Sequence, residues 1–197
     1  MNMQIVSGSL LMYRLTGSEA LLGTMALATG LPMIVFSLYG GAIADRVQKK
    51  RILIWCLIIS ALISLCVALA LETGNLSREN TGSWWILMIS ALLHGTTMGL
   101  LMPARQSIIP EIVRREQIMN AIALNLLGFN VFGLLAPGIA GFMIDAFGFK
   151  SVYYTMTGLN LCGAVCMLFL PDTSKIAAHG SNILSDIKKR TEIYPAG

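Results

Sequence analysis

The sequence predicts an all-α membrane protein, and three observations lead to this fold class. Apolar residues make up 55% of the chain and charged residues 12%, whereas soluble domains have about 45–50% and about 25%. The mean hydropathy is +0.71. The apolar residues also gather in long runs separated by short charged segments. The nineteen glycines fit this class, because membrane helices tolerate Gly and approach each other over small side chains.

Five apolar runs are long enough to cross a bilayer, whose core of about 30 Å needs about 20 helical residues. Each run is bounded by charges, Pro or turn residues, and none contains Lys or Arg between its ends. The predicted helices cover residues 19–44, 52–71, 84–102, 118–143 and 151–170.

A shorter apolar run, residues 3–13, precedes Arg14 and offers only about 20 Å of helix. We predict a partial first helix there and expect this chain to be a fragment. Residues 1–170 are then a transmembrane bundle and residues 171–197 a cytoplasmic linker or tail. In the tail, Ile183, Leu184 and Ile187 recur at helical spacing. This favours a short interfacial helix, with a disordered linker as the alternative.

Basic residues are distributed unequally between the two sides that six alternating helices define. Eleven lie on one side and three on the other, so the positive-inside rule predicts the orientation. Loops 45–51 and 103–117 and the tail are predicted to be cytoplasmic, in an inner or plasma membrane. The eleven are Arg46, Lys49, Lys50, Arg51, Arg105, Arg114, Arg115, Lys175, Lys188, Lys189 and Arg190, and the three are Arg14, Arg78 and Lys150.

A short pattern recurs in the two halves of the chain. Gly41 to Asp45 and Gly141 to Asp145 share the spacing Gly-x-x-x-Asp, and Lys50 and Lys150 follow at the same distance. One copy lies on the predicted inside and the other outside, as an inverted 3+3 repeat requires. A chance match of two short motifs is the alternative.

The loop after the second predicted helix carries a family resemblance. Gly41-x-Ile43-Ala44-Asp45-Arg46-x-x-Lys49-Lys50 is similar to the major facilitator superfamily (MFS) signature Gly-x-Leu-Ala-Asp-Arg-x-Gly-Arg-Lys, with Gln48 at its second Gly. Residues 103–125 are similar to the branch that contains the enterobactin exporter and drug-efflux-like permeases. Residues 133–141 resemble an antiporter signature with Ala at two Gly positions. Residues 92–99 have no Arg of the kind that many proton-coupled members carry in helix 4.

The resemblance implies the N-terminal six-helix half of an MFS transporter, with helix 1 truncated. The implied function is secondary active export of a siderophore- or drug-like small molecule by alternating access. Its partners would be the lipid bilayer, the substrate, and a C-terminal six-helix half or a second copy. There are two alternatives: a non-transport membrane subunit derived from a transporter half, and a half-size homodimeric transporter.

No set of residues for an enzyme is recognised in the sequence. It shows no nucleophile and base pair, phosphate loop or metal cluster, so we expect no cofactor, and an ion or proton gradient or the substrate's own gradient would drive transport. The formal net charge of +4 comes from short loops between apolar runs, which argues against nucleic-acid binding.

A cytoplasmic gate is the first candidate site that the resemblance implies. Asp45 lies at a helix end, where Arg side chains or a helix N-terminus stabilise a partly desolvated carboxylate. With Arg46 and Lys49 it would latch the two transporter halves, and Arg105 is a second potential partner. The alternative is that these charges only set topology. The predicted gating residues are Gly41, Asp45, Arg46, Lys49, Lys50 and Arg105.

Polar side chains at membrane depth form the second candidate site, a substrate or proton path. His94 lies in the middle of the fourth predicted helix, where an ionisable group is costly. The alternative is a neutral imidazole that Thr96 or Thr97 satisfies. Asn125 and Asn130 could face a central cavity, although hydrogen bonds between helices are the commoner role of such Asn.

Helix 5 also contains a predicted packing motif. Gly133, Pro137, Gly138 and Gly141 are expected to allow close helix contact and a bend rather than to touch substrate.

Overall fold

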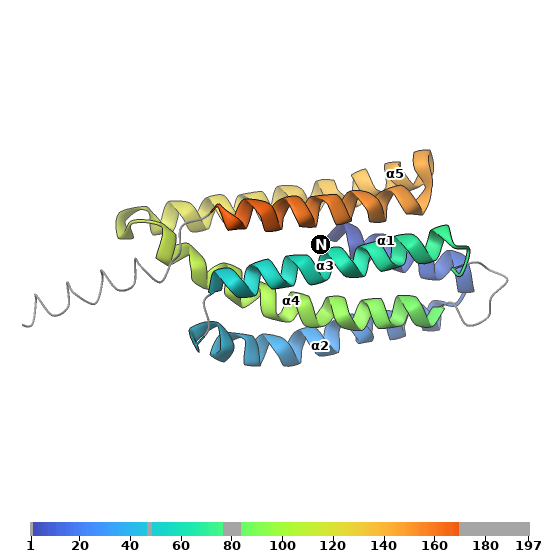
Figure 1. The fold of residues 1–197 in the computed structure, drawn as a ribbon, viewed down its shortest axis with the longest axis horizontal. Coiled ribbons are helices and arrows are strands. Elements are labelled where there is room, and N and C mark those ends of the chain that lie inside the picture. Colours follow the sequence, from blue (N-terminus) through green and yellow to red (C-terminus); the bar gives the residue numbers. More distant parts are fainter. Residues whose placement is uncertain (1, 47–48, 77–83, 170–197) are drawn as a thin grey trace, which may run out of the picture.

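A computed structural model describes residues 2–46, 49–76 and 84–169 of the chain, and within these residues the protein is all-helical (Figure 1). The side chains of residues 2, 40–46 and 111–112 are also outside the description. The predicted tail, residues 171–197, lies outside the described residues. The helices are α1 (Asn2–Thr16), α2 (Glu19–Arg46), α3 (Lys49–Glu72), α4 (Trp84–Ile112) and α5 (Ile118–Leu168), with a short 3₁₀ turn, η1 (Arg115–Gln117), before α5.

Helix α5 is two antiparallel arms rather than one rod. Gly148 has φ 78° and ψ 172°, which is not a helical conformation. Because this backbone region is open almost only to Gly, the residue permits an abrupt reversal. Figure 1 shows the chain turning back at this point, so that residues 118–147 form a first arm and residues 149–168 a second.

The helices run side by side along the long axis of the molecule and alternate in direction (Figure 1). Helix α2 packs on α4, α3 packs on α5 and α4, and α1 packs mainly on α5. One end of the bundle, where α2 is followed by α3 and α4 by α5, carries Lys49, Lys50, Arg51, Arg105, Arg114 and Arg115, and we call it the basic end. The opposite end carries Gly17 and Gly148 and is called the Gly148 end.

Two glycines of α4 bring it unusually close to α2. A Cβ added to Gly95 would lie 2.2 Å from the carbonyl oxygen of Thr29, and one added to Gly99 would lie 2.7 Å from that of Met33. Glycines four residues apart share one face of a helix. Any larger residue would therefore force α2 and α4 apart, as in other membrane helix pairs that meet over small residues.

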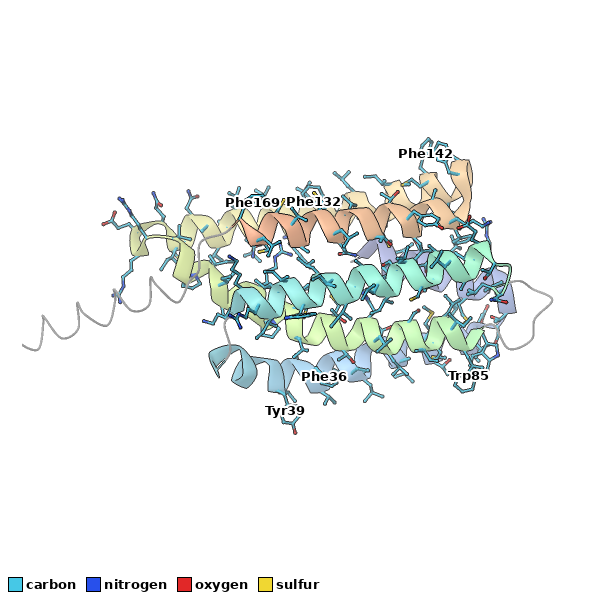
Figure 2. The ribbon with its side chains drawn as sticks, in the orientation of Figure 1. Phe36, Tyr39, Trp85, Phe132, Phe142 and Phe169 are labelled. Carbon is cyan, nitrogen blue, oxygen red and sulfur yellow. The ribbon has the colours of Figure 1, made fainter. Side chains whose placement is uncertain are left out.

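Much of the apolar surface faces outward. In the described residues, four stretches are long and apolar enough to cross a membrane, namely Glu19–Tyr39, Lys49–Glu72, Trp84–Pro110 and Arg115–Leu168. Only 6% of the most apolar window of α2 is buried, against 44% in α3 and α4. Tyr39 of α2 and Phe142 of α5 project from opposite sides of the bundle (Figure 2). Such exposure suits a protein whose solvent is lipid.

The predicted loops 45–51 and 103–117 are wrong in extent. Helix α2 continues to Arg46, α3 already begins at Lys49, and α4 continues to Ile112 through Pro103 and Pro110. The physical reason is that charged residues end an apolar run without ending a helix. A Pro removes only one backbone donor, and α3 packs against this part of α4 through Leu53, which helps the helix to continue past Pro103.

Candidate functional site

A groove between α4 and the first arm of α5 contains the clearest polar contact between two helices. Arg105 of α4 donates a hydrogen bond from Nη2 to Oδ1 of Asn125 on α5, at 3.0 Å. The cavity beside this pair has a volume of about 370 Å³. We call it the Arg105 groove; besides Arg105 and Asn125 it is lined by Leu124, Gly128, Phe129, Phe132, Gly133 and Ala136.

Local helix geometry explains why these residues meet. Gln117 donates its backbone N–H to the carbonyl of Arg114 at 2.8 Å in the turn that connects α4 to α5. The first arm of α5 then runs back towards the Gly148 end, antiparallel to α4 (Figure 1). The lining residues of α5 recur every three or four positions from Asn125 to Ala136, and this spacing places them on one helix face. The groove is thus a continuous stripe of α5 with the Arg105 guanidinium at one end.

Two predicted gating residues tie helix ends together at the basic end. Lys49 donates from Nζ to the carbonyl oxygen of Ser107 on α4, at 3.4 Å. Lys50 donates from Nζ to the carbonyl oxygen of Leu168, the last residue of α5, at 3.2 Å. A cation at a helix C-terminus also complements the helix dipole. In this structure the two lysines therefore hold α3 against α4 and α5.

Three residues of the predicted gate have side chains outside the described part of the structure. The backbone of Gly41, Asp45 and Arg46 belongs to α2, whereas the positions of their side chains are not described. The contact that the structure gives for Arg105 is with Asn125. The latch through Asp45 stays a prediction.

His94 occupies a separate buried place in the middle of the bundle. Its side chain is 3% exposed, and neither ring nitrogen has a hydrogen-bond partner among the described residues. A small cavity of about 20 Å³ adjoins the ring, between α1, α2, α4 and α5. Its polar lining groups are Gln4, Thr29, Ser90 and Tyr153.

The hydrogen bond that the alternative for His94 expects is absent among the described residues, because Thr96 and Thr97 do not satisfy the ring. Both hydroxyls donate to carbonyl oxygens one turn back in α4, those of Leu92 at 3.0 Å and Leu93 at 2.8 Å. A Thr hydroxyl in a helix commonly takes this partner. His94 is therefore a buried polar ring that lines the small cavity and has no hydrogen-bond partner among the described residues.

The other predicted residues of α5 are divided between the groove and the outer surface. Asn125 and Gly133 line the Arg105 groove. Asn130 does not, and its Nδ2 donates to the carbonyl of Leu126 in its own helix at 2.9 Å. Pro137 lies inside the first arm. A Cβ added to Gly138 or Gly141 would meet nothing within 4 Å, so in the described residues these glycines make no close helix contact. The close contact between helices is made by Gly95 and Gly99 of α4 instead.

The Gly148 end holds a cluster of polar contacts that was not predicted from the sequence. Nη2 of Arg14 on α1 lies 4.0 Å from Oδ1 of Asp145, and the same guanidinium stands 5.3 Å from the ring centre of Phe149. Tyr154 of α5 donates a hydrogen bond to Glu72, the last residue of α3. The only signal for these partners in the sequence was their common predicted side of the membrane.

The fold and the distribution of apolar surface define a polytopic helical membrane protein. The chain belongs to the Major Facilitator Superfamily, whose family model matches residues 1–190. This superfamily is one of membrane transporters rather than enzymes. This match does not show the narrower resemblance to the enterobactin-exporter branch.

Several curated relatives are distantly similar in sequence. The uncharacterized MFS-type transporter YfiS of Bacillus subtilis (strain 168) is 24% identical over 159 residues, which cover 81% of this chain and 36% of that protein. The quinolone resistance protein NorA of Staphylococcus aureus (strain MRSA252) is 26% identical over 188 residues, covering 92% of this chain and 45% of NorA. NorA of strain Mu50 is 26% identical over 157 residues, covering 79% and 37%. The chain thus spans less than half the length of these relatives.

Proposed function

We propose that this chain is the N-terminal six-helix part of an MFS exporter that moves a small organic molecule out of the cell by alternating access. The observation that carries the proposal is the Arg105 groove, a polar and aromatic recess on a membrane bundle of this superfamily. The similarity to NorA, a quinolone resistance protein, supports export of a drug-like compound.

The two arms of α5 support the six-helix architecture. Counting residues 118–147 and 149–168 separately, the described chain has six helical segments that alternate in direction. Inverted three-helix repeats of this kind occur in transporters with sites between their halves. The low burial of α2 leaves a long apolar face for lipid or for a second bundle.

The orientation proposed from the sequence places the basic end in the cytoplasm. Arg105, Arg114 and Arg115 then lie on the inner side, as the positive-inside rule requires. The groove would receive its compound from the cytoplasm or the inner leaflet and release it when the inner side closes. Asp45, Arg46 and Lys49 are the proposed latch for that closed state.

Drug accumulation in intact cells tests this function. The whole gene that encodes this chain would be expressed in a quinolone-sensitive bacterium, and uptake of a fluorescent quinolone would be followed over time. We expect lower steady-state accumulation than with an empty vector, and Asp45→Asn should abolish most of this difference. Glu116→Gln, an exposed change in the same cytoplasmic region, is the matched control and should keep it.

The alternatives predict other results in the same cells. A non-transport subunit would leave accumulation of every tested compound at the vector level. A half-size homodimer would export when residues 1–197 alone are expressed, and bifunctional reagents would then yield crosslinked pairs.

A further inference from the structure

We propose that the Arg105 groove binds an amphiphilic organic anion, with the anionic group at Arg105 and Asn125 and the apolar part along Phe129 and Phe132. This inference rests on the proposed export function, because it names the class of compound that the exporter would recognise.

The charge of Arg105 lacks an anionic partner in the described part of the chain. Its guanidinium has five N–H donors, and the hydrogen bond that the structure gives it goes to the neutral amide of Asn125. The ion pair among the described residues is Arg14–Asp145, at the other end of the bundle. A carboxylate, sulfonate or phosphate could accept the remaining donors in the forked geometry that guanidinium favours.

The position of Arg105 along α4 suits the charged end of an amphiphile. It lies 21 residues after Trp84, the first residue of the helix. At 1.5 Å per residue this is about 30 Å, close to the thickness of the apolar core. With Trp84 at one boundary of the apolar core, Arg105 would lie near the other, where an anionic group stays partly hydrated while its apolar part enters the bundle.

The remainder of the groove suits an aromatic body. From Asn125 to Ala136 it follows α5 for about 16 Å. Phe129 and Phe132 are 40% and 71% exposed, and Phe132 is labelled in Figure 2. Aromatic rings stack on such exposed faces. Gly128, Gly133 and Ala136 are small, and the resulting volume of about 370 Å³ lies within the usual range of ligand pockets, about 300–1,000 Å³.

A pair of dyes with one ring system tests the anionic preference. The full chain would be reconstituted in phosphatidylcholine nanodiscs and titrated with 8-anilinonaphthalene-1-sulfonate and, separately, with N-phenyl-1-naphthylamine, which lacks the sulfonate. Empty nanodiscs supply the background. Arg105→Gln should weaken sulfonate binding at least about tenfold, since it removes a hydrogen-bonded charge, and change binding of the neutral dye less than about twofold.

Two further variants keep the result interpretable. Arg114→Gln removes one positive charge from the same end but does not line the groove, and it should leave the affinity for both dyes unchanged. Phe132→Ala should weaken both dyes to a similar degree, and because this side chain is exposed the bundle should fold without it. Unchanged sulfonate affinity in Arg105→Gln, or equal loss of both dyes, overturns the proposal. So does unchanged binding of both dyes in Phe132→Ala.

The lipid composition of the nanodiscs distinguishes two sources of the anion. If phosphatidylglycerol displaces the sulfonate dye, the anionic group that the groove takes up is a lipid headgroup. If it does not, the groove takes a soluble organic anion. Failure of the dye test leaves export of neutral or cationic compounds standing, whereas dye binding without any change in cellular accumulation counts against the export function itself.

Discussion

Arg14 and Asp145 meet at the Gly148 end of the bundle, where Nη2 of the arginine lies 4.0 Å from Oδ1 of the aspartate. The same guanidinium stands over the ring of Phe149, on the other side of Gly148. Helix α1 is therefore attached to both arms of α5 close to their turn. Asp145 corresponds to Asp45 in the repeated Gly-x-x-x-Asp pattern, but its arginine comes from another helix and not from the next position in the sequence.

Paired cysteines would test this proximity. With Cys56, Cys66, Cys162 and Cys166 replaced by Ser, the double variant Arg14→Cys and Asp145→Cys should crosslink rapidly with a short bifunctional thiol reagent. Both side chains are largely exposed, so the ion pair itself contributes only about 0–1 kcal/mol and the bundle should survive its loss. Arg14→Cys with Arg114→Cys, at opposite ends of the bundle, is the control. Equal yields from the two pairs would contradict the structure.

The contact between α2 and α4 should fail when Gly95 gains a side chain. Gly95→Ala places a Cβ 2.2 Å from a backbone oxygen of α2, so the helices must separate. We expect a loss of about 1–3 kcal/mol of unfolding free energy, as in other overpacked sites. Denaturation in mixed detergent micelles measures it. Gly158→Ala, where the new Cβ meets nothing within 4 Å, is the control, and an equal loss there would rule out this explanation.

The turn inside α5 should be sensitive to Gly148→Ala. A side chain at φ 78° and ψ 172° is strained whatever space surrounds it. The expected loss is about 1–3 kcal/mol of unfolding free energy. The same denaturation experiment checks it, because a chain that tolerates Ala here at no cost would have to turn elsewhere.

Removing the His94 ring should not destabilise the bundle much. Its nitrogens have no partner among the described residues, so His94→Leu loses no hydrogen bond and relieves the cost of a buried unpaired polar group, about 1–3 kcal/mol. The unfolding free energy should therefore stay the same or rise. A fall as large as that expected for Gly95→Ala would show that the ring does have a strong partner.

Labelling of single cysteines from outside the cell would test the orientation. In a background without native cysteines, Lys150→Cys should react with a membrane-impermeant maleimide in intact cells, because Lys150 is exposed next to the Gly148 turn. Glu116→Cys, in η1 at the basic end, should react only after the cells are opened. The reverse pattern would refute the proposed cytoplasmic basic end.

Sequence reasoning was strongest where a property depends on long stretches of residues. Apolar runs predicted an all-helical membrane protein, and the loop from Gly41 to Lys50 indicated the superfamily to which the chain belongs. These predictions do not depend on the exact helix ends, because a helix needs about 20 apolar residues to cross a bilayer wherever the helix begins. Helix ends were predicted less well, because α4 continues through Pro103 and Pro110 beyond its apolar run.

Contacts between helices could not be predicted from the sequence, because they depend on how each helix is rotated about its axis and on how far it is shifted along its neighbour. Gly95 and Gly99 looked no different from Gly138 and Gly141, yet only the first pair faces another helix among the described residues. Arg105 and Asn125 were both singled out, but for different roles, and their hydrogen bond follows from the turn at η1. An apolar helix carries little periodicity, so its sequence does not reveal which face a neighbour will cover.

The single-glycine turn of α5 has a consequence for biogenesis. The two apolar arms are joined by one residue, so no loop separates the end of the first arm from the start of the second. Each arm satisfies its own backbone hydrogen bonds as a helix, so the pair can enter the lipid as one helical hairpin. A substitution at Gly148 would then disturb the insertion of both arms at once.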